Sequence, residues 1–215
     1  MRRLQLVLAL TLAALAPVHG QQRDTHPRLF PPEQLVLLEG ADRSEWQQPD
    51  RVMDALLIAD GFRVADVGAG GGWFTIRLAR RVGPNGRVYA EDIQPEMIVS
   101  IEQRVKREDL KNVEIRSGTA SDPNLPKGLN AVLMVDTYPQ IREPIAVLTS
   151  IAASLAPNGK LGIVDFKPDG AGGPGPDLSE RISPDVIKRQ AAAAGLKLIS
   201  HETFLKYQYL LIFGK

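Results

Sequence analysis

Apolar runs alternate with amphipathic stretches through most of the sequence, and this alternation predicts its secondary structure. Helices are expected where apolar residues recur at helical spacing, at 74–82, 95–108, 145–155 and 184–194. Strands are expected over the short apolar runs at 62–67, 86–92, 113–117, 129–136, 160–166, 196–203 and 207–213. The run at 129–136 is nearly all apolar, as in a strand that is covered on both faces.

Repeated strand–helix alternation favours an α/β fold with a doubly wound, mostly parallel seven-stranded sheet and right-handed crossovers. The connection between the last two strands is too short for a parallel crossover, so they form a C-terminal antiparallel strand pair. The main interruption is a Gly/Pro-rich loop at 168–177. We expect one domain over residues 49–215.

The residues before this domain have a different character. Residues 21–32 are polar and include three prolines, which favours an extended arm. A short helix is expected at 33–39, and a second helix at 49–59 begins with a proline, as helices often do. We interpret residues 21–48 as an arm and lid over the domain.

Residues 1–20 have the layout of a secretory signal peptide. Arg2 and Arg3 precede an almost uncharged apolar run at 4–16, and Val18 and Gly20 stand at the usual cleavage spacing. The run has about 13 residues, whereas a bilayer-spanning helix needs about 20. The sequence predicts cleavage after Gly20, export to the periplasm or the medium, and no stable membrane span afterwards. The alternative is an uncleaved signal that anchors the protein to the membrane.

Charge and composition exclude several classes of function. Basic and acidic residues nearly balance, at 26 against 25, and they are mixed along the chain, so no nucleic-acid surface is expected. The chain has no cysteine, which excludes disulfides, a thiolate nucleophile and a thiolate zinc site. Only His26 and His201 remain after cleavage, so no multi-histidine metal site is expected, and His201, within a predicted strand, has a structural role.

The glycine loop VADVGAGGGWFT at 64–75 joins the first predicted strand of the sheet to a helix, where α/β sheets bind ligands. A dinucleotide fingerprint G-x-G-x-x-G would need its third glycine at Trp73, which is too large for close helix–strand packing. The spacing that fits is D-x-G-x-G-x-G, with Asp66, Gly68, Gly70 and Gly72. A nicotinamide-dependent oxidoreductase is therefore disfavoured, and a purely structural tight turn stays open.

This loop resembles the nucleoside-binding loop of class I S-adenosylmethionine-dependent methyltransferases. The resemblance implies that the cofactor's amino-acid part lies against bare backbone, with Asp66 near its ammonium group. In YAEDIQPEMI, Asp92 stands where the family binds the ribose hydroxyls, followed by Ile93. Strand alternation points Glu91 the other way. The alternative for Asp92 is an N-cap of the helix that begins near Pro95.

The resemblance extends over residues 49–215. RSGTASDPNLP at 116–126 is similar to the family's adenine loop, although many members read Gly-Asp-Ala where this chain has Gly118-Thr119-Ala120. The first carboxylate there, Asp122, is the predicted adenine contact, with an ordinary Asp-Pro turn as the alternative. VLMVDTY at 132–138 and LAPNGKLGIVDF at 155–166 are similar to the fourth and fifth strands, and the family inserts its last strand antiparallel between the fifth and the sixth. The resemblance is strongest to small-molecule methyltransferases of quinone biosynthesis. It implies S-adenosylmethionine as the cofactor and a small-molecule acceptor.

Methyl transfer needs alignment more than acid–base groups, since the cofactor's methyl is already activated. Asp136 and Tyr138 are the catalytic candidates nearest the expected methyl position, with Asp165 behind them. Asp136 could equally bond to backbone at the strand end. The family often has a histidine after such a tyrosine, where this chain has Pro139 and Gln140. Two hypotheses remain: methyl transfer driven mainly by positioning, or an exported binding protein that kept the fold and lost catalysis. The oligomeric state stays open.

Overall fold

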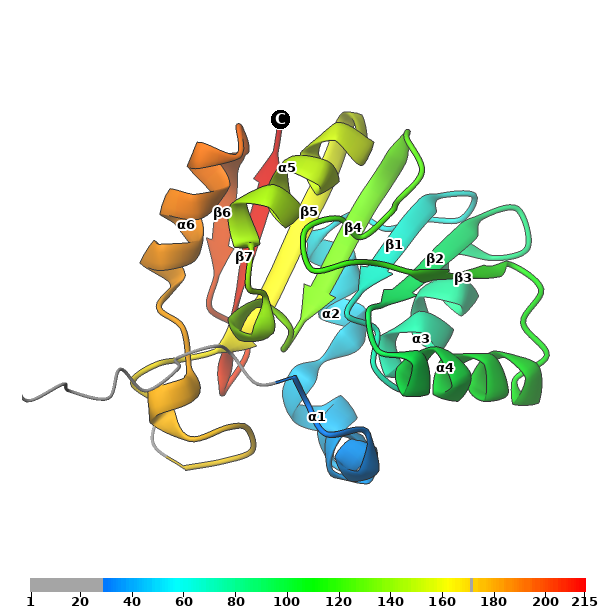
Figure 1. Ribbon diagram of the computed structural model, residues 1–215, viewed down its shortest axis with the longest axis horizontal. Helices are drawn as coiled ribbons and strands as arrows, with labels where there is room; N and C mark the ends of the chain where they lie inside the picture. Colours follow the sequence, from blue (N-terminus) through cyan, green and yellow to red (C-terminus); the bar gives the residue numbers. More distant parts are fainter. Residues whose placement is uncertain (1–28, 171) are drawn as a thin grey trace, which may run out of the picture.

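The computed structural model describes residues 29–170 and 172–215. The predicted signal peptide, residues 1–20, lies outside the described residues. Figure 1 shows one sheet with helices on both of its faces. None of the helices in the described part of the chain combines the length and the apolar character that crossing a membrane requires.

The sheet has seven strands in the order β3-β2-β1-β4-β5-β7-β6. The strands are β1 (Arg63–Val67), β2 (Arg87–Asp92), β3 (Val113–Ser117), β4 (Leu129–Val135), β5 (Leu155–Phe166), β6 (Lys197–Glu202) and β7 (Gln208–Gly214). Pairing is parallel from β3 to β5, whereas β7 is antiparallel to both β5 and β6. The predicted fold class and the predicted C-terminal antiparallel pair are both confirmed.

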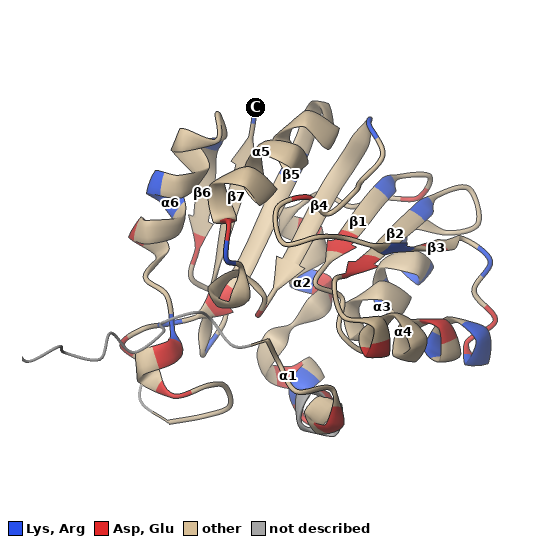
Figure 2. Cartoon of the chain, in the orientation of Figure 1, with Lys and Arg blue, Asp and Glu red and all other residues tan. Residues whose placement is uncertain are grey.

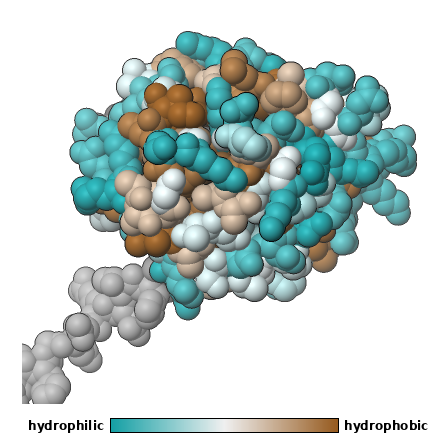
Figure 3. Space-filling view, turned by 90° about the horizontal axis from the view of Figure 1, so that it is seen from above, coloured by the Kyte–Doolittle hydropathy of each residue, from teal (hydrophilic) through white to brown (hydrophobic). Residues whose placement is uncertain are grey.

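Two apolar clusters fill the spaces between the sheet and its helices. On one face, α5 (Pro144–Ser154) and α6 (Pro184–Ala193) cover strands β4, β5 and β7 (Figure 1). On the other face, α2 (Pro49–Ala55) and α3 (Trp73–Val82) contribute to a second cluster. The central strands are thus buried on both sides, as their apolar runs predict. The outer surface seen from above carries hydrophobic residues in small groups between hydrophilic ones (Figure 3).

Proline starts most of the helices. It occupies the first turn of α2, α5, α6 and α4 (Pro95–Arg107), where a missing N–H leaves no intrahelical hydrogen bond unmade. At α6 the side chain of Ser183 also accepts a hydrogen bond from the backbone N–H of Asp185, at 3.3 Å. These signals explain why helix starts follow the sequence prediction closely.

Two predicted boundaries differ from the structure by more than one residue, and one predicted helix differs in type. The helix expected at 49–59 ends at Ala55, because the chain turns through Leu57 with a left-handed φ of 58°. Strand β5 begins at Leu155 rather than 160, since the turn-like residues before Lys160 lie in an extended segment whose pairing with β4 shifts register. The helix expected at 33–39 is a 3₁₀-helix, Pro32–Glu39. A further short helix, α1 (Arg43–Gln47), was not predicted.

Candidate active site

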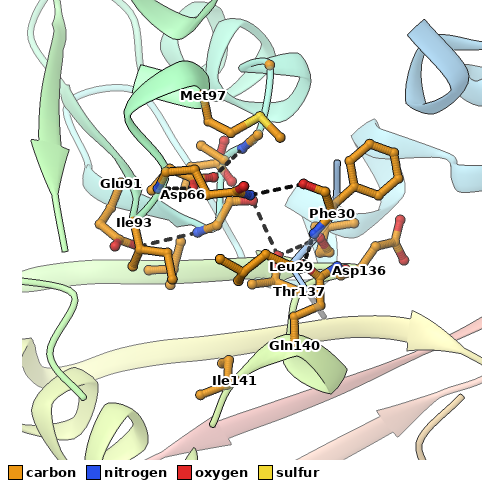
Figure 4. Close-up of a pocket in the computed structure, with 18 of the residues that line it drawn as sticks. Leu29, Phe30, Asp66, Glu91, Ile93, Met97, Asp136, Thr137, Gln140 and Ile141 are labelled. Atoms are coloured by element: carbon orange, nitrogen blue, oxygen red, sulfur yellow. Dashed lines mark hydrogen bonds between the residues drawn. The ribbon is translucent and has the colours of Figure 1, made fainter. Parts of the chain in front are cut away.

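A cavity of about 360 Å³ lies at the carboxyl ends of β1, β2 and β4. Strand order reverses beside β1, whose neighbours are β2 and β4, so the cavity occupies the position where α/β sheets bind ligands. Its volume is in the usual range for small-molecule sites. The glycine loop, the residues that follow β2 and β4, and residues of the N-terminal segment such as Leu29 and Phe30 line it (Figure 4).

The glycine loop needs its glycines for different reasons. Gly68, Gly70 and Gly72 all have left-handed φ angles, of 67°, 54° and 79°. A Cβ on Gly68 would overlap the side chain of Thr137, so the loop and the residues after β4 can approach only through glycine. A Cβ on Gly70 would meet only a Leu35 methyl at 4.0 Å, which leaves open space over that backbone. Gly68 and Gly70 line the cavity, whereas Gly72 is the N-cap of α3.

Asp92 lies at the cavity wall, at the end of β2. Its Oδ2 accepts a hydrogen bond from the amide of Gly70 at 2.9 Å, and its Oδ1 accepts one from the amide of Gln94 at 3.0 Å. The N-cap of α4 is Gln94 and not Asp92, so the alternative assignment of Asp92 is wrong. Burial raises the pKa of Asp92, and the backbone amides oppose that shift.

Glu91 also lines the cavity, although strand alternation predicted that it would point away. The prediction was wrong because the glycine loop crosses the end of β2: the amide of Gly68 donates to Oε2 of Glu91 at 3.3 Å. The carboxyl group occupies space that a Cβ on Gly118 would fill. Glu91 is 2% exposed, and burial raises its pKa to about 8. It therefore holds a proton at neutral pH.

Asp66, in the glycine-loop motif, lines the cavity and is held from behind. Its Oδ2 accepts a hydrogen bond of 2.7 Å from Oγ1 of Thr75, in the first turn of α3. Burial raises the pKa of Asp66 to about 6, so it is mostly ionised at neutral pH. Acidic residues thus gather at the lower ends of β1 and β2 (Figure 2).

Asp136 lines the cavity beyond the end of β4, with a left-handed φ of 57°. Its Oδ2 accepts from Nε2 of Gln47 at 3.1 Å, and its Oδ1 accepts a short hydrogen bond from Nε2 of Gln208. Nη2 of Arg43 lies 3.8 Å from Oδ2. Burial raises the pKa of Asp136 to about 6. Its carboxylate therefore bonds to side chains of α1 and β7, and not to backbone as the alternative supposed.

The N-terminal segment covers the cavity, as a lid would. The amide of Phe30 donates to Oε1 of Gln140 at 3.0 Å, and Nε2 of Gln94 donates to the carbonyl of Phe30 at 3.3 Å (Figure 4). Phe30 is therefore fixed between the end of β2 and the residues after β4. Trp46, which also belongs to the predicted arm and lid, packs against Phe166, with ring centroids 6.0 Å apart.

Besides Gly72, two further predicted site residues, Tyr138 and Asp122, do not line the cavity. Tyr138 is 2% exposed, packs within the cluster under α5 and α6, and donates from its hydroxyl to Oε1 of Gln190 at 2.7 Å. Asp122 accepts hydrogen bonds from the hydroxyl of Ser150 at 2.7 Å and from the amide of Asn124 at 2.8 Å. The Asn124 bond is the local turn that was the alternative for Asp122.

Other residues of these two regions line the cavity instead. Ala120 and Pro123 flank Asp122 and reach the wall, as does Thr137, the residue before Tyr138. Ile93 lines the cavity as predicted. Asp165 is buried in the sheet, where its Oδ1 accepts from the amide of Phe166 at 2.8 Å, and it does not line the cavity.

Comparison with known proteins agrees with this geometry. Residues 64–159 match a family described as a methyltransferase domain. The chain is similar to arsenite methyltransferase of Halobacterium salinarum, with 32% identity over 109 residues, 50% of this chain and 28% of that protein. It is similar to demethylmenaquinone methyltransferase of Geobacillus sp., with 34% identity over 82 residues, 38% of this chain and 34% of that protein.

A solved structure is similar over most of the chain. It is a SAM-dependent methyltransferase from Aquifex aeolicus, with a TM-score of 0.81 and 27% identity, covering 86% of this chain and 98% of that one. The region that matches the methyltransferase-domain family, residues 64–159, includes the glycine loop, all but the first residue of β1, and strands β2 to β4. The comparisons support S-adenosylmethionine as the cofactor of this domain and a methyltransferase as the class of enzyme. The chain spans less than half the length of each of the two curated relatives above.

Proposed function

We propose that this protein transfers the methyl group of S-adenosylmethionine to an organic small-molecule acceptor, and that it acts outside the cytoplasm. One observation carries the cofactor assignment. Asp92 is hydrogen-bonded to the backbone of Gly70 at the switch point of the sheet, beside open space over that glycine. A carboxylate in this position suits a ribose diol, and bare backbone suits a closely approaching ligand.

The charge of the cavity suits the same cofactor. Its wall carries the carboxylates of Glu39, Asp66, Asp92 and Asp136, whereas Glu91, which is protonated at neutral pH, adds no charge. S-adenosylmethionine carries two positive groups, an ammonium and a sulfonium, against one carboxylate. Asp66, mostly ionised at neutral pH, is the residue we expect to hold the ammonium. Ala120 and Pro123 offer an apolar wall that suits adenine.

The chemistry would depend mainly on position. When bound, S-adenosylmethionine supplies an activated methyl group on its sulfonium sulfur. The protein's part is to hold the acceptor in line with that methyl and to exclude water. Asp136 already accepts bonds from Gln47 and Gln208, and the hydroxyl of Tyr138 faces Gln190. An acceptor that is already nucleophilic, such as an amine, a thiolate or a readily ionised phenol, fits this arrangement.

The lid favours an organic acceptor. Leu29, Phe30 and Ile141 give the covered side of the cavity an apolar wall. A soft ion such as arsenite would call for thiolate ligands, and the chain has no cysteine to provide them. We therefore do not expect this protein to share the arsenite acceptor for which the relative from Halobacterium salinarum is named.

One observation favours a second candidate, the exported binding protein without catalysis. Both oxygens of Asp136 are engaged, which leaves no uncommitted general base beyond β4 among the described residues that line the cavity. Two measurements separate the possibilities. Calorimetric titration with S-adenosylhomocysteine and with NAD should show binding of the first alone. Production of S-adenosylhomocysteine from S-adenosylmethionine with a panel of amines, thiols and phenols should then reveal turnover. Binding of S-adenosylhomocysteine without any turnover would favour the second candidate, and binding of NAD alone would contradict the proposal.

A further inference from the structure

The glycine loop contains one glycine that its motif does not include. The spacing D-x-G-x-G-x-G uses Gly68, Gly70 and Gly72, and all three have left-handed φ angles. Gly71 stands between two of them, and its φ does not lie in the left-handed region. A side chain at position 71 would therefore cause no backbone strain. The reason for a glycine here lies in what faces it.

Gly71 faces the N-terminal segment of the chain. A Cβ at this position would lie 3.3 Å from Cδ2 of Leu35 and 3.1 Å from Oε1 of Glu39, both closer than an ordinary van der Waals contact. Leu35 and Glu39 line the cavity, as does Phe30. We refer to residues 29–48, the described part of the predicted arm and lid, as the lid. A side chain at position 71 would push the lid away from the glycine loop.

Three interactions hold the lid in this position. Glu39 forms an ion pair with Arg104 of α4, whose side chain is 13% exposed. Near the start of the lid, the backbone of Phe30 bonds to the side chains of Gln94 and Gln140 (Figure 4). A partly buried ion pair is screened less than a surface pair. The lid is thus fastened to α4 and its N-cap on one side of the cavity, and to the residues after β4 on the other.

We propose that the lid gates the exchange of the cofactor and that Gly71 is the seat on which the lid closes; this rests on the cofactor assignment proposed above. Lid residues and the strand ends both line the cavity, so a ligand held between them leaves when the three interactions break. These interactions join the lid to the protein and not to the ligand. They therefore act on the rates of ligand entry and exit more than on the affinity. Lid opening of this kind limits turnover in many enzymes.

Stopped-flow binding of S-adenosylhomocysteine tests the gate. The chain has two tryptophans, Trp46 in the lid and Trp73 in the cavity wall, so intrinsic fluorescence can follow binding. We expect Gly71→Leu to raise both the association and the dissociation rate constants roughly 3- to 10-fold, as for a lost hydrogen bond. The dissociation constant should stay within about threefold of that of the unmodified protein, because both rate constants change together.

Glu39→Gln is an independent second variant, since it weakens the ion pair with Arg104 and leaves position 71 unchanged. It should raise both rate constants in the same way. Gln34→Leu is the matched control. It also introduces a leucine at the lid, but it replaces an exposed side chain that does not line the cavity. Its rate constants should equal those of the unmodified protein.

Two results would overturn the inference. One is unchanged rate constants in either variant, Gly71→Leu or Glu39→Gln, with that variant folded. The other is a weaker affinity with slower association in Gly71→Leu, which would mean that position 71 contacts the ligand itself. If the unmodified protein does not bind S-adenosylhomocysteine, the cofactor assignment is wrong and the inference falls with it.

Discussion

The amide of Gly70 donates a hydrogen bond of 2.9 Å to Oδ2 of Asp92, and this bond joins the glycine loop after β1 to the end of β2. The other oxygen of Asp92 accepts from the amide of Gln94 at 3.0 Å. Two backbone donors thus fix the carboxylate at the cavity wall. A carboxylate offers about four acceptor positions, so Asp92 retains capacity for the hydroxyl groups of a ligand.

Gly70→Val should abolish cofactor binding without unfolding the domain. The new side chain would stand in the open space over residue 70, where only a Leu35 methyl lies within 4.0 Å. Gly61→Val is the matched control, because Gly61 also has a left-handed φ, of 78°, and open space around it. Both changes force a side chain into a left-handed conformation and should destabilise by about 1–2 kcal/mol. Calorimetric titration should show binding of S-adenosylhomocysteine to Gly61→Val and none to Gly70→Val. Equal affinity in the two variants would show that the glycine loop is only a structural turn and does not bind the cofactor.

Glu91 should make the protein less stable as the pH rises. The folded protein keeps a proton on this carboxyl up to a pKa of about 8, whereas the ordinary pKa of a glutamate side chain is 4.5. Between these values the folded state binds more protons than the unfolded state, so the free energy of unfolding falls with rising pH. Glu91→Gln keeps an acceptor for Gly68 and removes this titration. We expect it to be more stable than the unmodified protein at pH 8.5 by on the order of a few kcal/mol, and much less so at pH 5.

Chemical denaturation at several pH values measures this difference. The comparison between the two proteins matters more than either curve, because Asp165 also has a pKa well above its usual range and contributes to both. Parallel stability curves for the two proteins between pH 5 and pH 8.5 would show that Glu91 is ionised in the folded state.

Asp136→Asn should reduce turnover only moderately. Asp136 joins Gln47 of α1 to Gln208 of β7, which is the role of an anchor rather than a base. An amide has one oxygen acceptor in place of two, so one donor loses its partner and the lid is held less firmly. We expect a loss below the roughly 10²- to 10⁴-fold that is typical of removing a general base. A steady-state assay with a good acceptor measures this; a larger loss at unchanged cofactor affinity would identify Asp136 as the base.

Export predicts a mature protein that starts at Gln21. The prediction rests on the basic start, the apolar run at 4–16 and the cleavage spacing before Gln21. Expression of the full chain in a host with a secretion pathway, followed by intact-mass measurement of the purified protein, checks it. A full-length mass together with recovery in the membrane fraction would instead indicate an uncleaved anchor.

The sequence predicts what depends on local signals. The glycine loop and Asp92 were found because their spacing along the chain is fixed by one strand, one turn and the next strand. The parallel sheet and the antiparallel final pair followed from the alternation of elements and from the short final connection, whereas the place of the last strand between the fifth and the sixth was implied by the family resemblance. Glu91 was misplaced because alternation describes a strand and not its last residue, beside which a neighbouring loop can bring a backbone donor such as Gly68.

Local sequence patterns could not predict the contacts between segments that lie far apart along the chain. Arg43 and Gln47 lie in a helix of five residues, too short for a periodic pattern, and they meet Asp136 only through the tertiary fold. Tyr138 was misjudged for a similar reason. It lies directly after residues that line the cavity, but the partner of its hydroxyl, Gln190, is on α6 beneath the sheet. Only the packing of α6 could show which way this side chain points.

The most direct test of the cofactor site is the affinity of Asp92→Ala for S-adenosylhomocysteine, measured by calorimetric titration beside the unmodified protein and Glu91→Gln. Loss of hydrogen bonds to a charged group should weaken binding by about 1.5–3 kcal/mol, or roughly 10- to 150-fold. Glu91→Gln keeps a neutral acceptor at the neighbouring position and should bind within a few-fold of the unmodified protein. Unchanged affinity in Asp92→Ala, with the variant folded and the unmodified protein binding, would contradict the assignment of Asp92 to the ribose.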